Sequence, residues 1–432
     1  MASIGIAGAG LLGRLLAWRL SATHEVTVFD PADGPQATSD GRGAAAFTAA
    51  GMLSPLAELE TSGPRVAELG WRSIALWREI AQALSHAPLA ASALPEACGT
   101  CTACAPAAGA AEPADIHFRA LGSLLLAHGS DLGAARRVLA RLETAPNLAA
   151  GLPTPQALDR AALAALEPSI DPRLHAWLLP GEGQILPLQM LPALCAASPR
   201  VRWHWNTRVR EVTPGQLRLE DGSSPRFDLA IDVRGVGARP DAPVRGVRGE
   251  VVWLQAPGVT LHRPVRLLHP RHRVYIVPRP CDHIVIGASE IESEDRSPVS
   301  LKSAVELMAA AQSVIPELAE ARIVHLETNL RPALPDNEPH THVEPGLLRI
   351  NGLFRHGWLL APALVEDALT QVDVASRAPE DPHPNPLPQA GEGVSRHHTT
   401  LATEGPSLPR PSGERAGVRG TPEQTPESHQ NH

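Results

Sequence analysis

The sequence is poor in aromatic side chains and almost free of lysine. Only 3% of its 432 residues are aromatic, and Lys302 and Tyr275 are the single lysine and the single tyrosine. Arginine therefore carries nearly all of the positive charge, and the net charge is −8. This charge argues against a protein that binds the phosphate backbone of a nucleic acid.

The sequence also lacks a long apolar run and an even set of cysteines. Its five cysteines do not suggest the disulfide framework of a small secreted protein. No apolar stretch reaches the length of a membrane span. The apolar start, from Ile4 to Leu20, has no basic segment before it and contains Arg14, unlike a signal peptide. We therefore expect a cytoplasmic protein without stable membrane insertion.

The first thirty residues carry the pattern of a dinucleotide-binding unit. The apolar periodicity predicts a buried strand at 3–7, a helix at 11–20 and a second strand at 25–29. The turn between the first strand and the helix reads G-A-G-L-L-G, from Gly8 to Gly13. This order of elements is the fingerprint of adenine dinucleotide sites, and a glycine-rich turn in an ordinary α/β unit is the alternative.

Each position of this turn has a physical role. Gly8 permits the tight turn, Gly10 lets the backbone approach a pyrophosphate, and Gly13 lets helix and strand pack closely. The helix N-terminus offers unpaired N–H groups and a partial positive charge to phosphates. Asp30, after the second strand, is placed to accept hydrogen bonds from a ribose.

Further elements follow along the chain. Small residues from Ala44 to Leu53 would let a flat ring lie against the backbone, or would begin an alanine-rich helix. Helices are predicted from Pro64 to Leu84 and from Thr154 to Leu166. Apolar runs at 249–254, 274–277, 284–286 and 322–330 predict strands of a large antiparallel sheet.

Two segments have low complexity. Residues 86–115 are rich in Ala and Pro and contain Cys98, Cys101 and Cys104, a spacing found in part of some iron–sulfur sites. A fourth ligand is not evident, so we expect an exposed insertion and no metal. Residues 376–432 lose all apolar periodicity and are predicted to be a disordered tail, because they cannot offset their ordering entropy by burial.

Four stretches resemble the FAD amine oxidases of the D-amino-acid oxidase superfamily, and within it the glycine oxidases of thiamine biosynthesis. They are Ala49–Leu53, Tyr275–Arg279 with Ile286–Ala288, Leu330–Pro332, and Phe354–Pro362. The last follows a second glycine-rich turn, Gly352 to Gly357, that leads into an apolar helix. In that family such a helix N-terminus faces the flavin.

The resemblance implies an α/β fold with a Rossmann-like FAD domain of the glutathione-reductase type and an inserted antiparallel-sheet substrate domain. The FAD domain would comprise 1–85, 186–245 and 330–375. The substrate domain would comprise 86–185 and 246–329. Some relatives tether FAD through a cysteine near the carboxylate-binding strand, but this neighbourhood reads Thr328–Asn329–Leu330 here. The resemblance therefore implies non-covalent FAD.

The resemblance also implies the site residues. Arg331 would clamp a substrate carboxylate, which a planar bidentate donor suits well. Tyr275 would add a hydrogen bond, and Arg355 would lie near the substrate. Plainer roles remain open: a surface arginine, a core tyrosine and a salt-bridged arginine, respectively. The implied FAD-binding residues are Gly8, Gly10, Leu12, Gly13, Asp30, Ala49, Gly51, Met52, Val209, Gly235, Gly352, Arg355, His356, Gly357, Trp358 and Leu359. His356 departs from the family, which has a smaller polar residue there.

The function implied is oxidative deamination of glycine or another small amino acid to the imine and then glyoxylate. Oxygen would be reduced to hydrogen peroxide, and the imine would supply thiazole synthesis. Alternatives are an oxidase or dehydrogenase of sarcosine or D-amino acids, a tRNA-modification-type FAD oxidoreductase, and a flavoprotein without catalysis. The sequence leaves a homo-oligomer open.

Overall fold

The computed structural model describes residues 1–38, 43–85, 116–148, 151–268 and 273–377. The predicted insertion at 86–115, with its three cysteines, lies outside the described residues. So does the predicted tail, except for its first two residues, which belong to the last helix.

A six-stranded sheet contains the N-terminal unit. Its order is β18-β19-β12-β1-β2-β9, and only β18 runs antiparallel to its neighbour. The central strand β1 has parallel neighbours on both edges, and its apolar side chains are buried by the layers packed on the two faces of the sheet. The strands are β1 (Ser3–Ala7), β2 (Glu25–Phe29), β9 (Arg202–His204), β12 (Leu229–Asp232), β18 (His340–Glu344) and β19 (Leu347–Asn351).

A second large sheet has eight strands. Its order is β17-β13-β16-β15-β14-β5-β7-β6, and all pairs are antiparallel except β14 with β5. The strands are β5 (Ser123–Ala127), β6 (Gln156–Leu158), β7 (His175–Leu179), β13 (Arg245–Gln255), β14 (Val265–Leu268), β15 (Arg273–Arg279), β16 (His283–Gly287) and β17 (Arg322–Ala333). The large antiparallel sheet predicted from the sequence is confirmed.

Two small sheets complete the strands. One pairs β3 (Met52–Leu53) and β4 (Phe118–Arg119) with β8 (Gly183–Ile185), and the other is the hairpin of β10 (Val209–Thr213) and β11 (Gln216–Leu219). The α-helices are α1 (Leu11–Leu20), α2 (Ala45–Thr48), α3 (Pro55–Glu58), α4 (Pro64–Leu84), α5 (Leu132–Leu142), α6 (Ala145–Leu148), α7 (Arg160–Leu166), α8 (Pro187–Ala196), α9 (Leu301–Val314) and α10 (Gly357–Arg377). Short 3-10 helices are η1 (Gly129–Asp131), η2 (Gly235–Ala238) and η3 (Pro316–Glu320).

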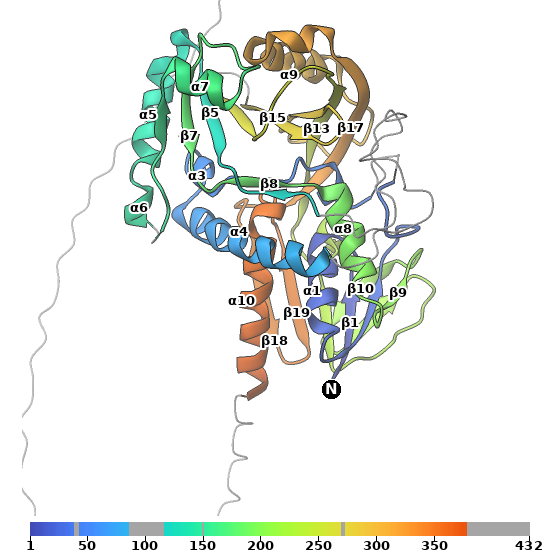
Figure 1. Ribbon diagram of the computed structural model, residues 1–432. Coiled ribbons are helices and arrows are strands. Elements are labelled where there is room, and N and C mark those ends of the chain that lie inside the picture. The colour runs from blue at the N-terminus through green and yellow to red at the C-terminus, as the bar shows by residue number, and fades with distance from the viewer. Residues whose placement is uncertain (39–42, 86–115, 149–150, 269–272, 378–432) are drawn as a thin grey trace, which may run out of the picture. The chain divides into compact units, whose positions relative to one another are not determined.

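The two largest apolar cores of the described residues lie one against each of the two large sheets. Helices α1, α4, α8 and α10 bury residues such as Leu16, Trp77 and Leu360 against the six-stranded sheet. Helix α9 covers the eight-stranded sheet (Figure 1), and Leu307 of the helix and Ile276 of the sheet belong to the same apolar core. Within the described ranges, no helix combines the length and apolar character needed to cross a bilayer.

The helix predicted from Thr154 to Leu166 is wrong in its first part. Residues Gln156–Leu158 form β6, which pairs with β7 at the edge of the large sheet, and only Arg160–Leu166 is helical. Asp159 ends the strand and caps the helix, because its Oδ1 accepts a hydrogen bond from the N–H of Ala162 at 2.8 Å. The helix predicted from Pro64 to Leu84 is confirmed.

The proposed division into two domains stays a prediction. The six-stranded sheet draws its strands from three separate parts of the chain, which agrees with a discontinuous domain. Strand β17, however, continues to Ala333 and so crosses the expected boundary at residue 330.

Candidate active site

The glycine turn after β1 has the geometry expected of a dinucleotide site. Gly8 has φ = +104°, and a Cβ there would lie 2.7 Å from the carbonyl oxygen of Val233. A Cβ on Gly13 would lie 1.8 Å from the carbonyl oxygen of Gly8, so any side chain would separate α1 from the turn. A Cβ on Gly10 would meet only the Cβ of Ala44, at 3.7 Å. Gly8 and Gly13 are therefore required for close packing, whereas Gly10 faces open space.

A cavity of about 800 Å³, here the glycine-turn cavity, opens above this turn. Most of the residues expected to bind FAD line it: Gly8, Gly10, Leu12, Asp30, Ala49, Val209, Gly235, Arg355, Gly357 and Trp358. Gly13 and Gly352 do not line it, since both are placed where a Cβ would collide with the protein itself. Gly51, Met52, His356 and Leu359 line a second, adjoining cavity instead.

Asp30 stands at the carboxyl end of β2 and holds the turn. Its Oδ2 accepts a hydrogen bond from the N–H of Ala9 at 2.6 Å, and its Oδ1 accepts one from the N–H of Ala32 at 2.8 Å. The carboxylate is thus oriented by the backbone while it lines the glycine-turn cavity.

A second helix N-terminus reaches the same cavity. Gly352, with φ = +80°, and Phe354, with φ = +49°, turn the chain from β19 into α10, which begins at Gly357. The N–H of Phe354 donates to the carbonyl of Pro332 at 2.8 Å, which ties this turn to β17. The indole of Trp358 donates to the carbonyl of Ala46 at 3.0 Å. Gly357 and Trp358 therefore present the start of α10 to the cavity.

These features fit an elongated anionic cofactor of the adenine dinucleotide class. The first turns of α1 and α10 contain no acidic residue, so their unpaired N–H groups and partial positive charges are available to a ligand. The open space at Gly10 allows a phosphate to approach the backbone. Small residues from Ala44 to Ala46 and Ala49 line the cavity beside α10. The interpretation of the 44–53 segment as an alanine-rich helix start holds for one turn only, α2.

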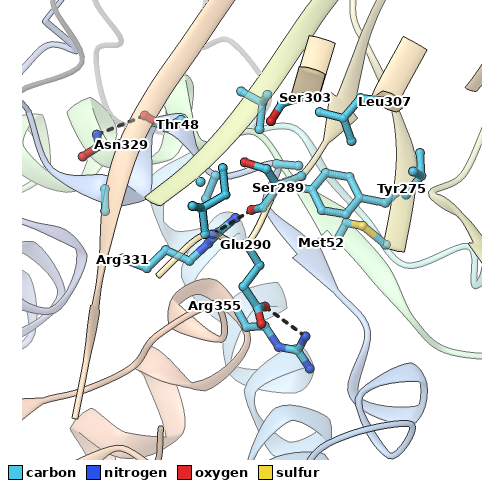
Figure 2. A pocket seen from close by; sticks show the side chains of 18 of the residues that line it. Thr48, Met52, Tyr275, Ser289, Glu290, Ser303, Leu307, Asn329, Arg331 and Arg355 are labelled. Carbon is cyan, nitrogen blue, oxygen red and sulfur yellow. Dashed lines mark hydrogen bonds and ion pairs between the residues drawn. The ribbon is translucent and has the colours of Figure 1, made fainter. Parts of the chain in front are cut away.

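The second cavity, here the arginine cavity, has a volume of about 620 Å³ and is lined by Tyr275, Arg331 and Arg355 (Figure 2). It shares Ala45, Ala49, Asn329, Arg355 and Trp358 with the glycine-turn cavity, so the two cavities adjoin. The structure thus brings together the three residues that the sequence assigned to catalysis.

Arg331 lies across β13 with its guanidinium in the arginine cavity. Its Nη1 donates to the carbonyl of Ser289 at 3.0 Å and to that of Arg248 at 3.3 Å. Both partners are neutral oxygens, and no carboxylate of the described residues forms an ion pair with Arg331 in the structure. Burial lowers the pKa of Arg331, and Tyr275 and Glu290 act in the opposite direction. A partly buried guanidinium that forms no ion pair with the described residues is suited to bind an external carboxylate.

Glycines on neighbouring strands make room for the two catalytic candidates. A Cβ on Gly249 of β13 would lie 2.4 Å from Cζ of Arg331. A Cβ on Gly287 of β16 would lie 2.4 Å from Oη of Tyr275. Burial raises the pKa of Tyr275, so the phenol remains a hydrogen-bond donor at neutral pH. Sequence analysis assigned no role to either glycine, although glycine inside a strand often marks such a close approach.

Arg355 is in a different situation, because it belongs to a buried ionic cluster around Glu58. Its Nη2 donates to Oε2 of Glu58 at 2.8 Å, and it also bonds Thr61. Arg266 reaches the other oxygen of Glu58 at 2.9 Å, and Nε2 of His356 lies 3.0 Å from Oε2. Burial alone would raise the pKa of Glu58, but these three basic groups outweigh it and hold the pKa well below its usual range. Sequence analysis missed Glu58 and Arg266.

A comparison with models of protein families identifies the family of this chain. A family model described as FAD dependent oxidoreductase matches residues 3–367. The chain therefore belongs to this family of FAD-dependent oxidoreductases, as its sequence predicted.

Among curated proteins, the chain is 34% identical over 375 residues to a Rhizobium etli protein named "Putative thiamine biosynthesis oxidoreductase ThiO". That match covers 86% of this chain and 97% of the relative. The glycine oxidase of Geobacillus kaustophilus is 26% identical over 404 residues, with 86% and 94% covered.

Solved structures agree on the fold. The crystal structure of glycine oxidase from Geobacillus kaustophilus has a TM-score of 0.69 at 24% identity and covers 88% of this chain and 96% of its own. Iminodiacetate oxidase from Chelativorans sp. BNC1 has a TM-score of 0.69 at 21% identity, with the same two shares covered. The predicted α/β fold and the FAD cofactor are confirmed.

A metal centre finds no support in the part of the chain that the structure describes. There, His, Cys, Asp and Glu do not gather in any group of three that could hold an ion. The three cysteines of 98–104 lie outside the described residues.

Proposed function

We propose that this protein oxidises the amine of glycine or another small amino acid, using FAD that is bound without a covalent link. The amine loses hydrogen from Cα and from nitrogen to give the imine, and water then converts the imine to glyoxylate and ammonia. FAD, when bound, takes up the two electrons and passes them to oxygen, which becomes hydrogen peroxide. The imine or glyoxylate would supply the thiazole synthesis of thiamine, in the cytoplasm.

The observation that carries the proposal is the unpaired guanidinium of Arg331 beside the phenol of Tyr275. Arg331 would bind the substrate carboxylate through two parallel N–H groups, and Tyr275 would donate a further hydrogen bond. Both side chains are set in strands, β17 and β15, of one sheet. Such rigid support holds a small substrate in one orientation, and orientation supplies much of the rate acceleration.

The chain's own residues would hold FAD in the glycine-turn cavity. The N–H groups at the start of α1 would face the pyrophosphate, Asp30 the ribose and the backbone at Val209 the adenine. The start of α10 would face the flavin from the side of the arginine cavity, where Ala49 and Trp358 border both cavities. The neighbourhood of β17 at Thr328–Leu330 contains no cysteine, which supports non-covalent FAD.

The names of the relatives support the same activity, since two of them are glycine oxidase and a ThiO protein. Sarcosine or a D-amino acid could use the same two residues. A tRNA-modifying oxidoreductase is less well supported, because the net charge is −8.

The decisive experiment is anaerobic titration of the yellow protein with a panel of amines. We expect glycine or another small amino acid to bleach the flavin, and acid precipitation to release all of it. A flavin that no amine bleaches would indicate a flavoprotein without this activity. Flavin that remains with the precipitated protein would contradict the non-covalent assignment.

A further inference from the structure

Glu290 is a charged residue of the arginine cavity that the proposed function does not use. It lies just after β16, and the backbone on both sides of it is anchored to β13. The N–H of Ser289 donates to the carbonyl of Glu250 at 3.3 Å, and Ile291 and Arg248 exchange two backbone hydrogen bonds at 2.9 and 3.0 Å. The side chain of Glu290 therefore projects from a well-held backbone into the cavity (Figure 2).

Arg331 is directly connected to this segment. It donates to the carbonyl of Ser289, the residue before Glu290, so the carboxylate-binding group and Glu290 lie side by side (Figure 2). The carboxylate of Glu290 also forms an ion pair with Nη1 of Arg355 at 3.5 Å, the long contact drawn in Figure 2. Glu290 thus stands between the two arginines.

The charges of the cavity leave Glu290 with a distinct role. Arg266, Arg331 and Arg355 line the cavity and are positive, and Lys302 and Glu306 of α9 line it as well. Glu58 also lines it, but is already held by two arginines and a histidine at 2.8–3.0 Å. Glu290 has one long ion pair, and 47% of its side chain is exposed. Among the carboxylates that line the cavity, Glu290 is the one that acts on the charge of Arg331, and its long ion pair leaves it able to accept hydrogen bonds from a positively charged group of a ligand bound there.

We propose that Glu290 binds the amine end of the substrate and selects amino acids over carboxylates that lack an amine. The inference rests on the proposed function, because it takes Arg331 as the group that binds the substrate carboxylate. An α-amino acid carries opposite charges two bonds apart, and Arg331 with Glu290 offers a matching pair of opposite charges. A ligand with a carboxylate alone gains from Arg331 but is repelled by Glu290.

The test compares glycine with acetate, which differ only in the amine. In the FAD-loaded protein without oxygen, glycine is characterised by the concentration that gives half of the maximal rate of flavin reduction, and acetate by the concentration that gives half of the flavin spectral shift on binding. Glu290→Gln should raise this concentration for glycine by about 5- to 30-fold, a range set by a partly exposed charge-assisted hydrogen bond. The same change should leave acetate binding unchanged or make it tighter.

Two further variants separate this role from a structural one. Glu290→Asp keeps the charge and should restore most of the preference for glycine. Glu292→Gln is the matched control: it removes the same charge two residues along, where Glu292 pairs with Arg245 and is 65% exposed. It should leave the ratio of the two affinities unchanged.

Other outcomes overturn the inference. If Glu290→Gln weakens glycine and acetate equally, Glu290 acts only by supporting Arg355. If the parent protein binds acetate as tightly as glycine, the amine is not recognised, although the carboxylate clamp stands. If the parent binds neither ligand, the proposed function fails and this inference fails with it.

Discussion

Arg355 donates from Nη2 to the carboxylate of Glu58 at 2.8 Å, whereas Arg331, in the same cavity, has only carbonyl partners. The difference supports separate roles for two arginines that the family resemblance had both placed near the substrate. Arg355 is ion-paired with a protein carboxylate and helps to build the cavity wall. Arg331 keeps its charge available for a ligand.

Substitution of Arg331 should therefore damage substrate binding far more than flavin binding. We expect Arg331→Ala to lose about 2–5 kcal/mol of binding free energy for the amino acid, because a desolvated charge pair loses one partner. Arg331→Lys should recover only part, since an ammonium cannot form the planar fork. The measurement is the amine concentration that gives half of the maximal rate of flavin reduction without oxygen.

The control for this series is Arg322→Ala, which removes an exposed arginine from the same strand. It should change neither flavin content nor substrate affinity. An Arg331→Ala protein that keeps its flavin and the parent's substrate affinity would move the carboxylate clamp elsewhere.

Tyr275→Phe should have a smaller effect than loss of Arg331. It removes one neutral donor to a charged acceptor, which is worth about 1.5–3 kcal/mol. The ring still fills the space above Gly287, so folding and flavin content should not change. The same anaerobic titration measures the effect, and a loss as large as that of Arg331→Ala would reverse the assigned ranking.

The glycine turn offers a pair of opposite predictions. Gly13→Ala should destabilise the fold by roughly 1–3 kcal/mol or more, because its Cβ would overlap the carbonyl of Gly8. Gly10→Ala should fold normally but bind FAD at least about tenfold more weakly, equivalent to ~1.4 kcal/mol, because the methyl group would occupy the cavity. Thermal unfolding of the apoprotein and flavin titration separate the two effects. Equal flavin affinity in Gly10→Ala and the parent would place the pyrophosphate elsewhere.

Glu58→Gln should lower the free energy of unfolding by about 3–5 kcal/mol at neutral pH, because it leaves buried arginines unpaired. The pKa of Glu58 is lowered in the folded protein, so its stabilisation is present above the ordinary pKa of 4.5 and is lost as the pH falls through the folded-state value. Denaturant unfolding should show that the difference in the free energy of unfolding between parent and variant becomes smaller from pH 7 to pH 3. A gap that does not change with pH would exclude this ionic contribution.

Glu182 should show the opposite pH dependence. Burial raises its pKa from 4.5 to about 7, against hydrogen bonds from Ser123 and the N–H of Ala57. The folded protein therefore keeps a proton that the unfolded chain releases, and stability falls as the pH rises from about 4.5 to 7. The loss should be about 2–4 kcal/mol, at ~1.4 kcal/mol per pKa unit.

Glu182→Gln has nearly the shape of the protonated glutamate and carries no charge, so it should be more stable than the parent above pH 7. Glu68→Gln, an exposed change on α4, is the control and should follow the parent at every pH. Parent and Glu182→Gln curves that run parallel from pH 5 to pH 8 would contradict the raised pKa.

Local pattern was sufficient for the elements that carry their own signal. Residues 3–29 contain a strand, a glycine turn, a helix and a second strand, and all four were predicted correctly. Local sequence periodicity is sufficient to predict them. The helix Pro64–Leu84 has a clear apolar face and was also predicted. Residues 154–166 misled the prediction, because the pairing of β6 with β7 depends on a partner strand that local periodicity does not reveal.

The sequence by itself thus determined a glycine-turn nucleotide site and, through family resemblance, Arg331, Tyr275 and Arg355 as candidates. Only the tertiary structure decided which arginine is available. Glu58 and Arg355 are 297 residues apart in the chain, and Gly249 lies under Arg331 only because β13 pairs with β17. Whether an arginine can bind a ligand depends on whether a carboxylate of the folded protein already pairs with it. When that carboxylate is hundreds of residues away in the sequence, no local sequence pattern predicts the pair.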